Sequence, residues 1–223
     1  MIRLANVSHD YGDRSLLTGV DLTIAPGAFN FLTGPSGAGK STLLKLCYGD
    51  LTQRSGEIEL FGQDLRSLSR DALADTRRRI GVIHQDCEFL DHLTLRDNVA
   101  LPFVATGRAV PDDDLHELLA WVGLDHKADA LPPTLSGGER QRAALARAVI
   151  MSPEVVLADE PTGNVDWEMS QRLLSLLIEL NRMGTAVMIA THDLHLIRTA
   201  KSQVTTRTLR IANQTLQAAG SEL

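Results

Sequence analysis

The chain has 223 residues, of which 43% are apolar, and this suffices for the core of one large domain. Its formal net charge is −6, so binding to nucleic acid has no general electrostatic support and we expect no direct nucleic-acid partner. Cys47 and Cys87 stand alone, which indicates neither a disulfide framework nor a zinc site. No apolar run reaches the roughly 18 residues of a membrane span, so we expect membrane contact only through a partner.

The first part of the chain predicts antiparallel strands, then a strand, a loop and a helix. Apolar residues alternate over 3–7 and 20–24, and a Gly- and Asp-bearing turn lies between these segments. This pattern predicts a small antiparallel β subdomain. The strand expected at 29–33 leads into a glycine-rich loop at 34–41, and helical spacing follows over 41–48.

The middle of the chain changes from strands to helices. Further strands are expected at 57–61 and 80–84, with a charged helix over 69–79 between them. The pattern is helical from 98 to about 149, where the acidic run at 112–114 suits a helix start by capping and by its interaction with the helix dipole.

The last part predicts buried strands between helices. Ser136 is expected to cap a helix that ends near Pro153. The wholly apolar runs 155–158 and 185–190 are typical of buried parallel strands, and a hairpin is expected within 206–217. Alternating strands and helices predict an α/β fold with a mainly parallel sheet.

Residues 34–41 form a complete G-x-x-x-x-G-K-S motif in the strand, loop and helix context that it requires. Its backbone amides surround a phosphate, Lys40 supplies a positive charge, and Ser41 offers a hydroxyl to Mg²⁺. The expected nucleotide-binding residues of this segment are Gly34, Pro35, Ser36, Gly37, Ala38, Gly39, Lys40, Ser41 and Thr42.

Two acids, Asp159 and Glu160, come directly after the apolar run 155–158. The carboxyl end of a parallel strand is where open α/β sheets bind their ligands. Successive residues there point in different directions, so one carboxylate can hold Mg²⁺ while the other activates a water as general base. The alternative, two surface acids in a loop, is weaker because an apolar strand precedes them.

Three further side chains are candidates by position. His192 and Gln85 each follow a predicted core strand, although an isolated histidine is more often structural than catalytic. Gln85 carries a neutral amide that can contact Mg²⁺ or the attacking water. Tyr11 can stack on adenine, and the alternative is ordinary packing in a turn.

The segment Leu135-Ser136-Gly137-Gly138-Glu139 decides among nucleotide-binding families. A P-loop followed by this signature resembles ATP-binding-cassette (ABC) nucleotide-binding domains over essentially the whole chain. The resemblance rests on Tyr11 as A-loop, 34–41 as Walker A, Gln85 as Q-loop, 135–139 as signature, 155–160 as Walker B, 164–166 as D-loop and His192 as switch.

The resemblance implies a P-loop NTPase fold in one domain, residues 1–223, with ATP and Mg²⁺ as cofactors. About 1–85 and 152–223 would form the core with the β subdomain, and 86–151 an inserted α-helical subdomain. It implies catalytic roles for Glu160, His192 and Gln85, and Mg²⁺ contacts from Ser41, Gln85 and Asp159.

The family also implies a homodimer on ATP binding. In that dimer Ser136 and Gly138 of one copy reach the γ-phosphate held by Lys40 of the other. A serine hydroxyl and glycine amides at a helix start would form an anion site with no anion of its own.

Segments 34–46, 97–102 and 157–164 most resemble the FtsE branch, bacterial cell-division ATPases that work with the membrane protein FtsX. This implies a peripheral protein on the cytoplasmic face of the inner membrane that acts with an FtsX-like subunit to control cell-wall hydrolases. By the same resemblance, 86–102 lines the groove for a helix of that subunit, and the alternative is ordinary core.

Other readings remain beside the division ATPase. The ATPase of a lipoprotein-release or macrolide-type exporter would share all of this chemistry. A soluble ABC protein acting on ribosomes or DNA is disfavoured because the chain has neither a second cassette nor a long coiled-coil insertion. The signature and the lack of an N-K-x-D motif argue against a P-loop kinase or GTPase.

Overall fold

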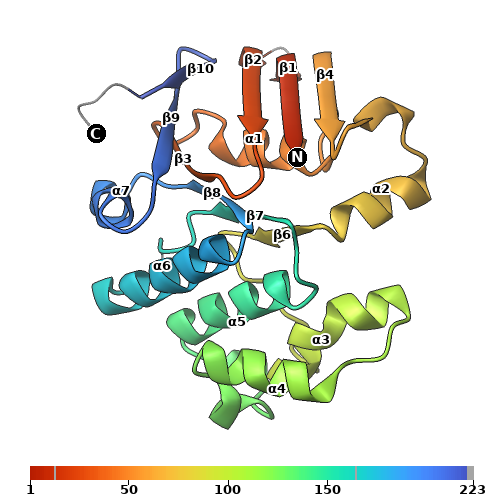
Figure 1. Cartoon of the computed structure of the whole chain (residues 1–223), viewed down its shortest axis with the longest axis vertical. Coiled ribbons are helices and arrows are strands. Elements are labelled where there is room, and N and C mark those ends of the chain that lie inside the picture. Colours follow the sequence, from red (N-terminus) through yellow and green to blue (C-terminus); the bar gives the residue numbers. More distant parts are fainter. Residues whose placement is uncertain (13, 164, 220–223) are drawn as a thin grey trace.

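The computed structural model describes residues 1–12, 14–163 and 165–219. At one end of the molecule lies an antiparallel sheet with the strand order β2-β1-β4-β5, which confirms the predicted β subdomain (Figure 1). Its strands are β1 (Ile2–Tyr11), β2 (Arg14–Ile24), β4 (Ser55–Leu60) and β5 (Gln63–Asp64). They bury alternate apolar side chains against the next layer, as the period of a half-buried strand requires.

The central sheet has the order β10-β9-β3-β8-β7-β6. It consists of β3 (Phe29–Thr33), β6 (Ile80–Ile83), β7 (Val155–Asp159), β8 (Ala186–Ala190), β9 (Thr206–Ala212) and β10 (Thr215–Ala218). All neighbouring pairs from β9 to β6 are parallel, and β10 joins as an antiparallel edge strand. The predicted mainly parallel sheet and the predicted terminal hairpin are therefore both confirmed.

The helices lie close to the predicted segments. They are α1 (Lys40–Cys47), α2 (Arg70–Arg77), α3 (Leu95–Thr106), α4 (Asp112–Trp121), α5 (Gly137–Val149), α6 (Trp167–Arg182) and α7 (Leu194–Lys201). Helix α4 begins at the acidic run, but the capping prediction was wrong: Pro111 occupies the cap position without a side-chain hydrogen bond, and the acids lie in the first turn. Their contribution there is to the helix dipole.

The central sheet separates two hydrophobic cores. Leu32, Leu157 and Met188 pack with α1 and the antiparallel sheet. Phe31 and Ile189, from the opposite face, pack against α5, α6 and α7. Burial of each such side chain contributes about 1.5–3 kcal/mol, so the strands whose ends carry the site are held from both faces.

A third cluster joins α3, α4 and α5 at the far end of the molecule (Figure 1). Helix α5 contributes Ala144 and Leu145 to the core under the sheet, and Ala143 and Ala146 to this third cluster. The helix that begins at Gly137 thus belongs to both. The predicted subdomain limits of 86 and 151 remain a prediction.

Candidate nucleotide-binding and catalytic site

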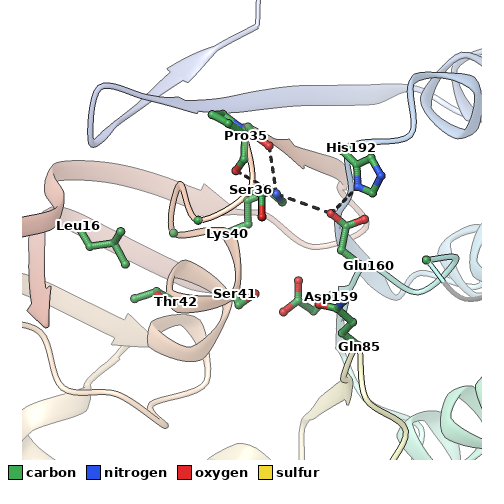
Figure 2. A pocket seen from close by; sticks show the side chains of 14 residues that line it. Leu16, Pro35, Ser36, Lys40, Ser41, Thr42, Gln85, Asp159, Glu160 and His192 are labelled. Atoms are coloured by element: carbon green, nitrogen blue, oxygen red, sulfur yellow. Dashed lines mark hydrogen bonds and ion pairs between the residues drawn. The ribbon is translucent and has the colours of Figure 1, made fainter.

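The site lies at the carboxyl ends of neighbouring strands of the central sheet. Strand β3 leads into the glycine-rich loop, β8 into His192, β7 into Asp159 and Glu160, and β6 into Gln85. Parallel strands end at one edge, so residues far apart in sequence meet there. Figure 2 shows these side chains around a common space.

That space is a cavity of about 530 Å³. Its lining residues are Leu16, Gly34, Pro35, Ser36, Gly37, Gly39, Lys40, Ser41, Thr42, Gln85, Asp159, Glu160, Gly163 and His192. Of the predicted loop residues, Ala38 faces a smaller hollow beside Ile211 and Asn213 instead. The cavity therefore brings together the predicted phosphate, metal and catalytic residues, apart from Ala38, Tyr11, Ser136 and Gly138.

The loop has a backbone that requires glycine. Gly34 and Gly39 have φ of 149° and 105°, values that side-chain-bearing residues rarely adopt. A methyl group at Gly34 would lie 2.9 Å from the Ile211 carbonyl oxygen, and one at Gly39 would lie 3.1 Å from Leu17. The loop consequently keeps the tight curl with which successive amides bind an anion.

Lys40 is folded back over this loop. Its Nζ donates to the carbonyl oxygens of Gly34 at 3.1 Å and Pro35 at 3.4 Å, and lies 3.7 Å from Glu160 Oε1 (Figure 2). The Lys40 and Glu160 side chains are only 10% and 11% exposed. The Lys40 ammonium is nearly buried, and its contacts are two carbonyl oxygens and one carboxylate at 3.7 Å. Phosphate oxygens can replace these contacts, because charge-assisted hydrogen bonds to them are stronger.

Glu160 is oriented by its backbone and by His192. Its φ of 45° lies in the left-handed region, which costs about 1–2 kcal/mol in a residue with a side chain. The Glu160 amide donates to the Ala190 oxygen at 2.8 Å, which holds this conformation. His192 Nδ1 lies 3.0 Å from Glu160 Oε1, so the carboxylate is held at the cavity wall.

Asp159 has an unsatisfied carboxylate. Burial is the main cause that raises its pKa, with the negative charge of Glu160 adding to it; the Ser41 hydroxyl and Lys40 act in the opposite direction. Its buried Oδ1 has no hydrogen-bond partner among the described residues. Ser41 and Gln85 lie on the same side of the cavity (Figure 2). These oxygen donors are the kind that Mg²⁺ prefers, so the residues fit the predicted ion.

Tyr11 and the signature residues lie away from this cavity. Tyr11 is 52% exposed, and its ring contacts the His9 ring edge-on at 5.0 Å. Ser136 caps α5, as predicted, and Gly138 lies in the first turn of that helix. Neither signature residue lines the cavity that contains Lys40.

The expectation that this helix start holds no anion was wrong. Glu139 Oε2 accepts from the Ser136 amide at 2.8 Å and from the Ser136 hydroxyl at 2.9 Å, while the Glu139 amide donates to Ser136 Oγ. Lys127 lies 3.2 Å from the same carboxylate. The cause is the capping box, in which an acid at the third helical position reaches back to the cap.

Comparisons with known proteins agree with this geometry. Residues 17–163 match the family model described as ABC transporter. The chain is 44% identical over 202 residues to the cell division ATP-binding protein FtsE of Haemophilus influenzae, covering 89% of this chain and 93% of that protein. It is 46% identical to the protein of that name from Escherichia coli K12, covering 88% and 90%.

The chain belongs to the ABC transporter family. A solved ABC cassette, MJ0796, matches this chain with a TM-score of 0.86 and 30% sequence identity. The match covers 98% of this chain and 98% of that one. That structure is described as the dimeric, post-hydrolysis state bound to ADP and Pi. This chain is accordingly an ABC ATPase with the predicted P-loop fold. Within the described ranges, no helix is long and apolar enough to cross a bilayer.

Two residues that line the cavity of this ABC cassette were not predicted. Leu16 reaches it from β2, and its apolar side chain carries no chemical signal in the sequence. Gly163 lies just after the acid pair, and its amide donates to the Glu160 oxygen at 3.0 Å. A glycine three residues beyond Glu160 is placed to close a tight turn on it, so the sequence could have indicated that Gly163 lies at the site. In the predicted D-loop, Asn164 lies outside the described residues, and Asp166 caps α6.

Proposed function

We propose that two copies of this chain hydrolyse ATP at sites that they share head-to-tail. The observation that carries this proposal is the separation of the signature from the cavity: Lys40 and Glu160 line it, whereas Ser136 and Gly138 do not. A second copy can bring its signature to the nucleotide. The similar cassette MJ0796 is dimeric, which supports pairing of two copies.

In this proposal the loop and Lys40 bind the phosphates. The glycine amides surround the β-phosphate, and Lys40 leaves the carbonyls of Gly34 and Pro35 for β- and γ-phosphate oxygens. Tyr11, already exposed and supported by the His9 ring, stacks on adenine.

Ser41, Asp159 and Gln85 are the proposed Mg²⁺ residues. When bound, the ion would neutralise charge on the β- and γ-phosphate oxygens. The unsatisfied Oδ1 of Asp159 is the observation in favour of this assignment, because a buried carboxylate oxygen without a donor needs a compensating charge.

Glu160 is the proposed general base and His192 its positioning partner. Water attacks the γ-phosphorus, its proton passes to Glu160, and the bond to the β,γ-bridging oxygen breaks to release ADP. Glu160 Oε1 lies 3.7 Å from Lys40 Nζ, so movement of Lys40 onto phosphate would also free the carboxylate. The His192 hydrogen bond then keeps Glu160 in place.

We further propose that this ATPase serves bacterial cell division. Relatives named cell division ATP-binding protein FtsE are 44% and 46% identical over about nine-tenths of the chain, which supports this role over the exporter alternatives. The protein would then lie at the cytoplasmic face of the inner membrane, with an FtsX-like subunit through which it controls cell-wall hydrolases.

A hollow of about 520 Å³ between α2, α3 and α5 supports a docked membrane partner. Pro102 and Met151 give it apolar lining. Arg77 lies there with its guanidinium bound to backbone carbonyls, and Arg147 lies over the Phe89 ring; neither forms an ion pair with a described carboxylate. An apolar helix with an acidic side chain would complement this hollow.

Residues 86–102 divide between the two readings of that segment. Val99 is fully buried in the helical cluster, as is Leu95, so these residues are core. Leu90 is 44% exposed and, with Phe89, lines a second hollow next to Gln85. Arg147 lines both hollows, so the exposed beginning of the segment is a further part that we propose to contact the partner.

The test is to solubilise membranes of the source cell, purify this chain, and identify the integral membrane protein that accompanies it. Recovery of an FtsX-like subunit, with four predicted membrane spans and a periplasmic domain, supports the division role. Recovery of a lipoprotein-release or export permease would contradict that role and leave the ATPase assignments intact. A Lys40→Ala chain is the matched control. Lys40 lines neither of the two hollows, so this variant should purify with the same membrane partner.

A further inference from the structure

The first turns of α5 and α6 meet at Gly138. Figure 1 shows the two helices side by side. A methyl group at Gly138 would lie 3.2 Å from Cγ and 3.4 Å from Cε of Met169, and its nearest atoms outside α5 all belong to that side chain. A distance of this size requires the neighbour to move. Met169 therefore packs directly against the signature.

Methionine side chains usually adapt to such contacts, but this one is held at both ends. The Met169 amide donates to Asp166 Oδ1 at 2.8 Å, the cap of α6. Its sulfur accepts from Arg142 Nη1 at 2.7 Å. Arg142 is only 7% exposed, so packing confines its guanidinium, and its Nε has no partner within the described residues.

These contacts join the two parts of the proposed machinery within one copy. Glu160 directly follows β7, and Asp166 caps α6 a few residues later. Met169 follows in the first turn of α6 and touches Gly138 on α5. A displacement of the α6 start is thus transmitted to the signature by a pinned side chain.

We propose that Met169 is a positioning residue for the signature. It sets the location of the α5 amino terminus relative to the acid-bearing segment of the same copy. This inference rests on the proposed function, in which Ser136 and Gly138 complete the partner's site. It adds a reason for glycine at 138 that lies within the copy itself: a side chain there would displace Met169.

The competing explanation is that Met169 only fills the core. Leu176 gives a matched control, because it lies two turns further on in α6 and, like Met169, is partly buried against the core under the sheet. A core-filling role would reduce stability in both variants alike. A positioning role reduces kcat in the Met169 variant alone, without weakening nucleotide binding to the copy's own P-loop.

The experiment uses the full chain and measures the affinity for a fluorescent ATP analogue, kcat at saturating ATP, and Tm. Met169→Ala is expected to lower kcat by about 10-fold or more with affinity unchanged within about twofold. Met169→Leu keeps a side chain against Gly138 and loses only the sulfur contact with Arg142, so it should keep more kcat than Met169→Ala. Leu176→Ala should lose Tm but not kcat. If Met169→Ala does not fold, Met169→Val replaces it.

A double-mutant cycle adds a sharper readout. Gly138→Ala should lower kcat because Met169 is displaced, and Gly138→Ala with Met169→Ala should be less impaired than the product of the single effects. Multiplicative effects, a normal kcat in Met169→Ala, or an equal kcat loss in Leu176→Ala would each overturn the inference.

Ser136→Ala separates this inference from the proposed function. If Ser136→Ala lowers kcat and Met169→Ala does not, only the positioning role fails. If Ser136→Ala leaves kcat unchanged, the signature takes no part in hydrolysis, and the proposed function fails together with the inference that rests on it.

Discussion

The cavity at the strand ends and the signature at the start of α5, residues 135–139, are assembled in different ways. Lys40, Asp159, Glu160 and His192 come from neighbouring strands, so the order of the sheet alone brings them together. Ser136 lies at a helix start whose carboxylate partner, Glu139, is its own. A sheet edge can thus complete a pocket within one chain, whereas this capped helix start lies outside that pocket and, in the proposed function, needs a second copy.

The largest expected effect concerns the cavity alone. Glu160→Gln removes the proposed base and preserves the side-chain volume, so it should reduce ATP hydrolysis by about 10²-fold or more. ATP binding should persist, and the protein should accumulate as a dimer. Phosphate release and size-exclusion chromatography with ATP measure both. Hydrolysis at the normal rate would show that the cavity contains a different base.

A mixing experiment tests whether the two ends belong to different copies. Lys40→Ala and Ser136→Ala chains should each be nearly inactive, because each damages both shared sites. In a mixed dimer one site has both intact residues, so mixing should restore about a quarter of the normal activity if chains pair at random. Activity that never exceeds the average of the two variants would contradict head-to-tail sharing.

Tyr11 tests how far the cavity extends. Loss of base stacking in Tyr11→Ala should raise the KM for ATP by about fivefold to tenfold, since such stacking contributes on the order of 1 kcal/mol or more. Because stacking needs only the ring, Tyr11→Phe should behave like the unmodified chain. Steady-state kinetics of both variants decide the matter, and an unchanged KM in Tyr11→Ala would remove Tyr11 from the site.

The smallest expected effect is a gain in thermal stability. Asp159 has a raised pKa in the folded chain because burial disfavours its charge, so its ionisation destabilises the fold above that pKa. Asp159→Asn should therefore raise Tm at neutral pH by about 2–4 °C for each kcal/mol recovered. The gain should vanish below the ordinary carboxyl pKa, where Asp159 is neutral in both states. Thermal unfolding with and without Mg²⁺ measures this, and a lower Tm at neutral pH would contradict it.

Much of the fold could be predicted because its signals are local. The apolar runs of β7 and β8 and the cap at Ser136 are visible in short segments of sequence. The order of the sheet then explains why Gln85 and His192 line the same cavity. The general rule is that parallel strands present the residues at their carboxyl ends along one edge of the sheet.

What the sequence did not reveal depends on side-chain contacts. Leu16 enters the cavity only because β2 passes beside the loop. The return of Glu139 to Ser136 was an exception, because the spacing Ser136-x-x-Glu139 is that of a capping box and was a usable signal in the sequence. The contact of Gly138 with Met169 joins residues about thirty positions apart and has no periodic signal.

The sharing of α5 between two hydrophobic clusters bears on how the molecule opens. Residues 143–146 of this helix anchor it in both clusters, so the amides of this stretch exchange with solvent when both clusters separate. This buried stretch is then protected like the strands on which it packs, whereas Ser136 and Gly137 at the helix start are exposed. Loosening of the outer helices α3 and α4 would consequently reach the catalytic half as well, and the chain would melt as one cooperative unit.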